Sequence, residues 1–218
     1  MACFSEVSGH GFFDKLATRA ENIDSLLCVG LDPHELELGE SKNAAGAKAF
    51  CLRLIEATSS VALAYKPNVA FFETFGAEGV AALKEVIAAV PSEIPVLLDA
   101  KRGDIGTTAA AYASAAFQEL GAHAITLNAY MGVDTVKPFL ADPARGVFVL
   151  CKTSNPSSNE LQTLTVGKSG RALFEEVASL CESWNGDKNV GLVVGATDAD
   201  ALSRARAAAP GLWILAPG

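Results

Sequence analysis

Residues Pro95–Thr108 read P-V-L-L-D-A-K-R-G-D-I-G-T-T and hold the pattern that decides the fold. The apolar run 96–98 is short and rich in branched side chains, which predicts a fully buried strand over 95–100. Side chains on a strand alternate between its two faces, so Asp99 and Lys101 are expected to point the same way. The stretch therefore places an acid and a base together at the end of a buried strand.

The second half of the stretch leaves the strand and begins a helix. Gly103 gives the backbone the freedom to turn sharply, which carries Asp104 into a loop. Thr107 and Thr108 are suited to capping a helix that the sequence predicts over 109–120. These charges could form a purely structural salt bridge at the strand end, since isolated ion pairs are often structural. They could instead form part of a functional site, and the rest of the chain decides between these two interpretations.

Apolar strands and helices alternate along the whole chain. The predicted strands are 26–33, 61–69, 95–100, 124–129, 147–152, 190–195 and 212–218. The predicted helices are 11–22 (on the barrel floor), 44–59, 76–90, 109–120, 133–140, 168–184 and 198–209. Regular alternation implies an α/β fold with a parallel sheet. Because no G-x-G-x-x-G follows the first strand, we expect a (β/α)8 TIM barrel rather than a doubly wound sheet.

The barrel is expected to form one domain over residues 1–218, because α/β barrels of this size do not split. The strand count stops at seven, one short of a full barrel. The last residues, 216–218 (A-P-G), resemble the start of a strand-to-helix loop. We therefore expect the last strand–helix unit to be missing from this chain, either because it is a fragment or because more chain normally follows.

Composition excludes several classes of protein. The formal net charge of −8 argues against a nucleic-acid partner, which normally selects a basic face. No apolar run approaches the ~20 residues that a membrane helix needs, and residues 1–6 lack the pattern of a signal peptide. Five scattered cysteines without a C-x-x-C pair indicate reduced thiols in a cytoplasmic protein. The three histidines are far apart, so no metal site is expected.

Polar residues end most of the predicted strands. They are Asp32, Lys66, Asn68, Asp99, Lys101, Asn128, Lys152 and Thr197. Barrel enzymes build their active sites at the carboxyl ends of several different strands. Charged or polar residues two apart, on two neighbouring strands, favour a functional cluster over a set of independent solvated strand ends.

Over residues 99–108 the sequence resembles the orotidine 5′-phosphate decarboxylase family, whose pattern is D-x-K-x-x-D-I-x-x-T. The pattern is met by Asp99, Lys101, Asp104, Ile105 and Thr108. Four further segments occur in the expected order: C-V-G-L-D-P (28–33), Y-K-P-N-V-A-F-F-E (65–73), L-C-K-T-S-N (150–155) and V-V-G-A-T (193–197). The resemblance covers essentially the whole chain and is closest to the branch found in some bacteria and protists.

The resemblance implies a role for each matching residue. It implies an array of alternating charges under the pyrimidine, made by Lys66, Asp99, Lys101 and Asp104. Residues reaching across a dimer interface into the other subunit's site would be Asp104, Ile105 and Thr108. The other substrate contacts would be Asp32 and Asn68 at the ribose, Thr153 and Ser154 at the pyrimidine edge, and Pro217 against the ring. The family's phosphate-binding Gln and Arg fall after residue 218, so this chain is expected to bind a phosphorylated ligand poorly.

The implied activity is the decarboxylation of orotidine 5′-phosphate to UMP in a homodimer, with Lys101 protonating C6 and without cofactor or metal. Two alternatives stay open. One is a magnesium-dependent sugar-phosphate decarboxylase of the same barrel superfamily, which shares D-x-K-x-x-D. The other is an inactive barrel, perhaps one end of a longer polypeptide fused to orotate phosphoribosyltransferase.

Overall fold

The computed structural model describes residues 11–167 and 170–218, and its centre is a curved sheet of parallel strands. The strands are β1 (Cys28–Leu31), β2 (Ala64–Pro67), β3 (Leu97–Arg102), β4 (Ala124–Leu127), β5 (Gly146–Lys152), β8 (Val190–Val194) and β9 (Trp213–Leu215). Hydrogen-bonded pairs join β1 to β2 and run from β3 through β4, β5 and β8 to β9. Two isolated bridges, Tyr65↔Val96 and Asn68↔Asp99, join β2 to β3. The strands therefore follow one another in chain order, as in a barrel and unlike a doubly wound sheet.

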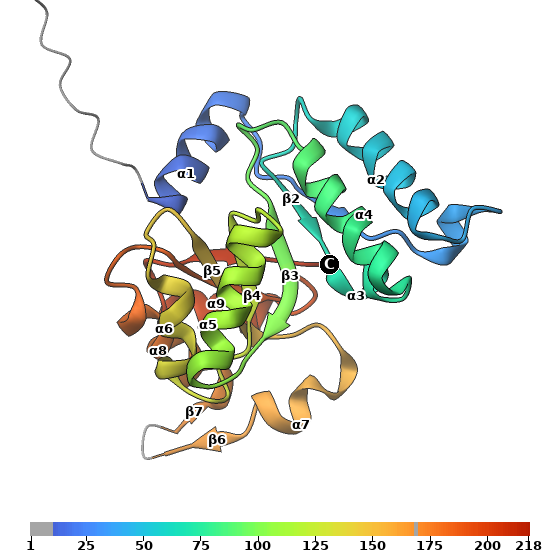
Figure 1. Ribbon diagram of the computed structural model, residues 1–218. Helices are drawn as coiled ribbons and strands as arrows, with labels where there is room; N and C mark the ends of the chain where they lie inside the picture. The colour runs from blue at the N-terminus through green and yellow to red at the C-terminus, as the bar shows by residue number, and fades with distance from the viewer. Residues whose placement is uncertain (1–10, 168–169) are drawn as a thin grey trace, which may run out of the picture.

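Helices surround this sheet (Figure 1). They are α1 (Phe12–Ile23), α2 (Ala44–Thr58), α3 (Val69–Glu73), α4 (Gly76–Ala89), α5 (Gly106–Ser114), α6 (Val133–Leu140), α7 (Asn159–Gln162), α8 (Leu173–Trp184) and α9 (Ala199–Ala208). Short turns are η1 (Glu35–Leu38), the π-helical η2 (Ala115–Glu119) and η3 (Pro156–Ser158), and a small hairpin joins β6 (Thr165–Val166) to β7 (Arg171–Ala172).

Strand alternation divides the core into two parts. Along β5, the side chains of Val147, Val149 and Cys151 belong to the outer core under the helices, whereas Phe148 belongs to the cluster inside the barrel. Helix α1 adds Phe12, Phe13 and Leu16 to the inner cluster, which confirms that this helix covers the barrel floor. The apolar inner cluster fills the floor of the barrel, where the strands begin. The other end of the barrel, where the strands finish, is therefore available for polar groups.

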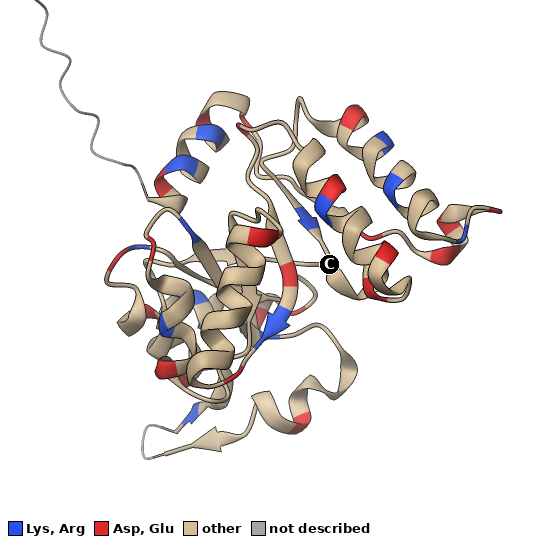
Figure 2. Ribbon diagram, in the orientation of Figure 1, with Lys and Arg blue, Asp and Glu red and all other residues tan. Residues whose placement is uncertain are grey.

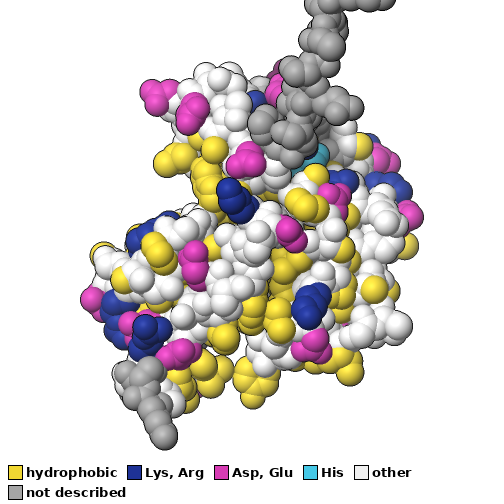
Figure 3. All heavy atoms as spheres, turned by 90° about the vertical axis from the view of Figure 1, so that its left-hand side faces the viewer, with side chains coloured by type: hydrophobic (Ala, Val, Ile, Leu, Met, Phe, Trp, Pro, Cys, Tyr) yellow, Lys and Arg dark blue, Asp and Glu magenta, His cyan; other side chains and the backbone are white. Residues whose placement is uncertain are grey.

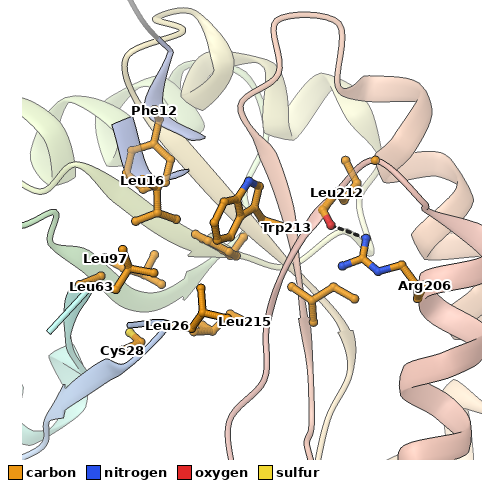
Figure 4. Close-up of a pocket in the computed structure, with 14 residues that line it drawn as sticks. Phe12, Leu16, Leu26, Cys28, Leu63, Leu97, Arg206, Leu212, Trp213 and Leu215 are labelled. Carbon is orange, nitrogen blue, oxygen red and sulfur yellow. Dashed lines mark hydrogen bonds between the residues drawn. The ribbon is translucent and has the colours of Figure 1, made fainter. Parts of the chain in front are cut away.

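The described strands leave one seam in the barrel wall, where β9 pairs only with β8 and β1 pairs only with β2. An apolar pocket of about 370 Å³ lies at this seam. Figure 4 shows Cys28 on one side of it, Trp213 on the other, and Phe12 from α1 above. Arg206 borders the pocket but donates a hydrogen bond to the carbonyl oxygen of Leu212 (2.6 Å), so it serves the backbone.

Most of the predicted strands and helices differ from the observed ones by one to three residues at an end, and three of the differences have a local cause. The helix predicted over 109–120 begins at Gly106 with Ile105 at its N-cap, so Thr107 and Thr108 lie in its first turn and do not cap it. The strand predicted over 61–69 is shorter, because Asn68 accepts a hydrogen bond from the N–H of Ala70 and starts α3 there.

The helix predicted over 168–184 begins only at Leu173, and residues 168 and 169 lie outside the described residues. Gly170 has φ +71°, a turn conformation that favours glycine. Glu175 accepts a hydrogen bond from the N–H of Ala172 (2.7 Å), which fixes the first turn of α8 at Leu173.

Within the described residues, no helix is both long and apolar enough to cross a membrane. Cys28, Cys51, Cys151 and Cys181 are free thiols, and Cys3 lies outside the described residues. On the face shown in Figure 3, acidic and basic side chains are interspersed with hydrophobic ones, and neither sign of charge dominates. That face therefore lacks the basic stripe that nucleic acids select.

Candidate active site

The charged residues of β2 and β3 lie at the carboxyl ends of adjoining strands (Figure 2). Ala64 and Leu97 face the inner cluster, so the residues two further on, Lys66 and Asp99, face inward above them. Strands β2 and β3 both begin with apolar residues and carry charged residues only toward their carboxyl ends. This order places an ionic cluster at the mouth of a barrel whose floor is apolar.

Lys66, Asp99 and Lys101 form one connected row. The Nζ of Lys66 lies 3.5 Å from Oδ2 of Asp99, and the Nζ of Lys101 lies 2.6 Å from Oδ1 of the same carboxylate. Asp99 is only 8% exposed, whereas the side chain of Lys101 is 48% exposed. One ammonium group therefore reaches the open mouth while its carboxylate partner is fixed below.

The environment of Asp99 keeps it ionised. Burial acts to raise the pKa of Asp99, but the hydrogen bond from Lys101, the charges of Lys66 and Lys101 and a hydrogen bond from Thr126 together hold that pKa below its ordinary value. A buried carboxylate of this kind carries a full negative charge at neutral pH.

Asp32 and Asn68 lie next to this row. Oδ1 of Asp32 accepts a hydrogen bond from the N–H of Asn68 (3.2 Å), and Oδ2 of Asp32 lies 3.8 Å from the Nζ of Lys66. The side-chain oxygen of Asn68 accepts a hydrogen bond from Ala70. Both residues therefore sit at the mouth beside Lys66.

Asp104, Ile105 and Thr108 are not brought to the row within one chain. Oδ1 of Asp104 accepts a hydrogen bond from the N–H of Ile105 (2.8 Å). In the described part of the chain, no ion pair joins Asp104 to a lysine. Ile105 is 58% exposed, although it is a large apolar side chain. These three residues project from the loop and the first turn of α5.

Thr153, Ser154 and Pro217 lie at the ends of β5 and β9. Gln162 holds Thr153 through two hydrogen bonds of 2.8 Å, one to its N–H and one to its hydroxyl. The backbone of Ser154 packs so closely on Gly195 that a Cβ there would lie 3.0–3.1 Å from Ser154 atoms. The carbonyl of Pro217 accepts the N–H of Ala196 (2.8 Å). Ser154 and Pro217 therefore lie against the residues that follow β8, and the side chain of Gln162 fixes Thr153 next to them in the chain.

Two buried polar residues at the mouth were not assigned a role by the sequence. Lys152 is 4% exposed and donates a hydrogen bond to the hydroxyl of Ser158 (2.6 Å), which ties the loop after β5 to the strand. Thr126 is 1% exposed and donates a hydrogen bond to Oδ1 of Asp99 (2.8 Å). The only signal for Thr126 is a polar residue inside an otherwise apolar strand, A-I-T-L (124–127).

The mouth can bind an anionic ligand and move a proton, because it presents an exposed ammonium group beside a buried carboxylate. Among the described residues, no three His, Cys, Asp or Glu side chains are grouped as a metal site. The apolar pocket at the seam is lined mainly by residues from the beginnings of strands, at the other end of the barrel. We therefore take the row of charges, and not that pocket, as the candidate active site.

Comparisons with known proteins agree on one family. The sequence profile described as the orotidine 5′-phosphate decarboxylase / HUMPS family matches residues 25–218. The orotidine 5′-phosphate decarboxylase of Herpetosiphon aurantiacus is 49% identical over 210 residues, which cover 95% of this chain and 78% of that protein.

Two solved structures are similar in fold as well as in sequence. The Leishmania donovani OMP decarboxylase is 60% identical, with a TM-score of 0.89, and the match covers 96% of this chain and 80% of that one. The L. donovani UMP synthase is also 60% identical, with a TM-score of 0.89, but the match covers 96% of this chain and only 45% of that one.

Proposed function

The chain belongs to the orotidine 5′-phosphate decarboxylase / HUMPS family, and from this premise we propose that it converts orotidine 5′-phosphate to UMP in pyrimidine nucleotide synthesis. The observation that supports the proposal best is the row of Lys66, Asp99 and Lys101 at the barrel mouth. The reaction is a carbon–carbon bond cleavage, in which C6 of the pyrimidine loses its carboxylate as carbon dioxide.

The difficulty of this reaction is electrostatic. When the bond from C6 to the carboxylate breaks, the electron pair stays on C6 in the plane of the ring, where the π system cannot delocalise it. A preorganised positive charge aimed at that position stabilises the developing carbanion. Lys101 is our candidate, since its ammonium group is fixed by Asp99 and open to the mouth. One N–H proton of Lys101 then passes to C6 and completes the product, and solvent reprotonates the amine.

Asp99 is proposed to act in two ways. It fixes the ammonium group of Lys101, and it lies beside the departing carboxylate of the substrate. Two like charges ~4 Å apart repel by about 4 kcal/mol at an effective dielectric constant near 20. Loss of carbon dioxide relieves that repulsion. We rank stabilisation by Lys101 first, because it acts directly on the charge that develops at C6.

The remaining site residues are proposed to hold the substrate. Asp32 and Asn68 are assigned to the ribose, Thr153 and Ser154 to the pyrimidine edge, and Pro217 to the ring. Asp104, Ile105 and Thr108 are assigned to the site of a second subunit, because in the described part of their own chain Asp104 pairs with no lysine and Ile105 is exposed. The functional unit would then be a homodimer with shared active sites, built from one barrel domain in each chain.

The UMP synthase among the similar structures supports one further proposal. That chain is much longer than this one and contains a matching barrel. The natural gene product of this sequence is therefore proposed to join the barrel to an orotate phosphoribosyltransferase domain. The intact mass of the natural gene product tests this directly, and a mass close to 22.6 kDa would contradict it.

The activity is tested by the loss of ultraviolet absorbance of orotidine 5′-phosphate, with and without an excess of chelator. We expect the natural gene product to convert the substrate at the same rate in both arms. Turnover that stops on chelation would favour the alternative, a magnesium-dependent sugar-phosphate decarboxylase. Absorbance loss no faster than with Lys101→Ala would contradict the proposed function.

A further inference from the structure

The pairing between β3 and β4 is irregular at the active site. Leu97 pairs with Ala124 and Leu98 with Ile125, but the next pair is Arg102 with Leu127. Residues 99–101 of β3 are therefore opposite the single residue Thr126 of β4. Extra residues on one strand interrupt the ladder of backbone hydrogen bonds and redirect side chains. The amides of this bulge need another acceptor.

Thr126 supplies that acceptor. Its hydroxyl oxygen accepts hydrogen bonds from the N–H groups of Ala100 (3.0 Å) and Lys101 (2.9 Å). The same hydroxyl donates its proton to Oδ1 of Asp99 (2.8 Å). A hydroxyl has one donor and two acceptor sites, so every hydrogen-bonding site of the Thr126 hydroxyl is occupied by the bulge. With 1% of its surface exposed, Thr126 has no water to replace these partners.

The bulge gives Lys101 an unusual backbone. Its φ is +48°, in the left-handed region that non-glycine residues seldom adopt. Residues persist in this region only where surrounding contacts fix them. The N–H of Lys101 is fixed by Thr126, and its Nζ is 2.6 Å from the carboxylate oxygen to which Thr126 also donates. One hydroxyl therefore holds both ends of the Asp99–Lys101 pair.

We propose that Thr126 is a positioning residue, whose hydroxyl holds the β3 bulge in the geometry that presents the Lys101 ammonium group to the substrate. This inference rests on the proposed decarboxylase function for its effect on turnover. Its structural part concerns the amides of Ala100 and Lys101 and can be measured without substrate. Thr126 acts through Asp99 and Lys101 and needs no contact with the substrate.

The test compares Thr126→Val, which keeps the shape but has no hydroxyl, with Thr126→Ser, which keeps the hydroxyl. We expect Thr126→Val to lower kcat by about tenfold or more, with KM changed by less than about twofold, because a misplaced catalytic group affects the chemical step. Thr126→Ser should restore most of the lost kcat. A Thr126→Val enzyme with kcat within about twofold of wild type, or a Ser variant as impaired as the Val variant, would overturn the proposal.

Thr135 provides a matched control. It is also buried (2% exposed), and its hydroxyl donates a hydrogen bond to the carbonyl of Gly132 (2.7 Å), outside the active site. Thr135→Val should lower the melting temperature to a similar degree without lowering kcat. If Thr126→Val does not fold, Thr126→Cys replaces it, since a thiol is a weak donor and acceptor of similar size.

Hydrogen exchange separates this inference from the proposed function. In the free protein, the amide protons of Ala100 and Lys101 should exchange faster in Thr126→Val than in wild type, while those of β5 stay unchanged. Unchanged exchange at both amides would overturn the structural part. If the wild-type protein fails to decarboxylate orotidine 5′-phosphate but the exchange difference appears, then the proposed function has failed and the anchoring by Thr126 has not.

Discussion

The Nζ of Lys101 lies 2.6 Å from Oδ1 of Asp99, and the two side chains differ sharply in exposure, at 48% and 10%. The carboxylate belongs to the interior of the barrel and the ammonium group to its mouth. An exposed ion pair is usually worth little, because solvent screens it and both side chains can move. Here Asp99 is fixed by burial and by hydrogen bonds from Lys66 and Thr126, so it holds the ammonium group of Lys101 at the barrel mouth.

Lys101→Ala is expected to lower kcat by about 10⁴-fold, because it removes the proposed proton donor, whose charge is also proposed to stabilise the carbanion. In the natural gene product, binding of a nucleotide monophosphate inhibitor should persist, since Asp32 and Asn68, the residues proposed to hold the ribose, are unchanged. Steady-state kinetics and calorimetric titration of the inhibitor measure the two effects. Lys84→Ala is the control, because Lys84 pairs with Glu119 on the surface (3.6 Å) and should not affect turnover. Activity of Lys101→Ala near that of wild type would reject the proton-donor role.

The lowered pKa of Asp99 predicts how its ionisation contributes to stability as pH changes. A carboxyl group whose pKa is lower in the folded than in the unfolded state stabilises the fold fully above the unfolded value, about pH 3.9. That contribution is lost as pH falls through the lower, folded pKa. We therefore expect the free energy of unfolding of wild type, relative to Asp99→Asn, to fall between about pH 5 and pH 2. Urea denaturation of both proteins across this range measures the difference, and a constant difference would contradict the assignment.

Much of the fold could be predicted because strand and helix periodicities differ and alternate regularly. The helix predicted over 133–140 has the bounds of α6, and the order of the parallel strands follows from the chain. The start of α8 could not be predicted, because it depends on a turn at Gly170 and a side-chain cap from Glu175.

The site was predictable only in part. Strand alternation correctly placed Asp99 and Lys101 on one side, but they meet through a bulge with φ +48° at Lys101, which no periodicity indicates. Thr126 was missed because a single threonine in a buried strand is an ordinary β residue. Its importance comes from the register between two strands, and register is set by tertiary pairing.

Gly195→Ala is expected to raise KM by roughly three- to tenfold while lowering kcat less, because its Cβ would press on the residue proposed to contact the pyrimidine edge. The new Cβ would lie 3.0 Å from the Cβ of Ser154 and 3.1 Å from its backbone, so the loop after β5 has to shift. Gly186→Ala is the matched control, since no atom lies within 4 Å of the Cβ it would add. Steady-state kinetics check both variants, and an unchanged KM for Gly195→Ala would show that Ser154 is not needed for binding.

Asp104→Asn is expected to lower turnover, and mixing this variant with Lys101→Ala should restore it, if each site combines the lysine row of one subunit with Asp104 of the other. A hybrid dimer then has one site in which both groups are intact. Random exchange of equal amounts gives roughly a quarter of wild-type activity, since half of the dimers are hybrids with one working site each.

Mixing Lys101→Ala with Asp99→Ala is the control, because Asp99 and Lys101 contact each other within one chain and every hybrid site keeps one defect. Subunit exchange is followed by mass spectrometry of the intact dimers. Exchange without recovery in the first mixture, or equal recovery in both mixtures, would mean that Asp104 does not serve the partner's site.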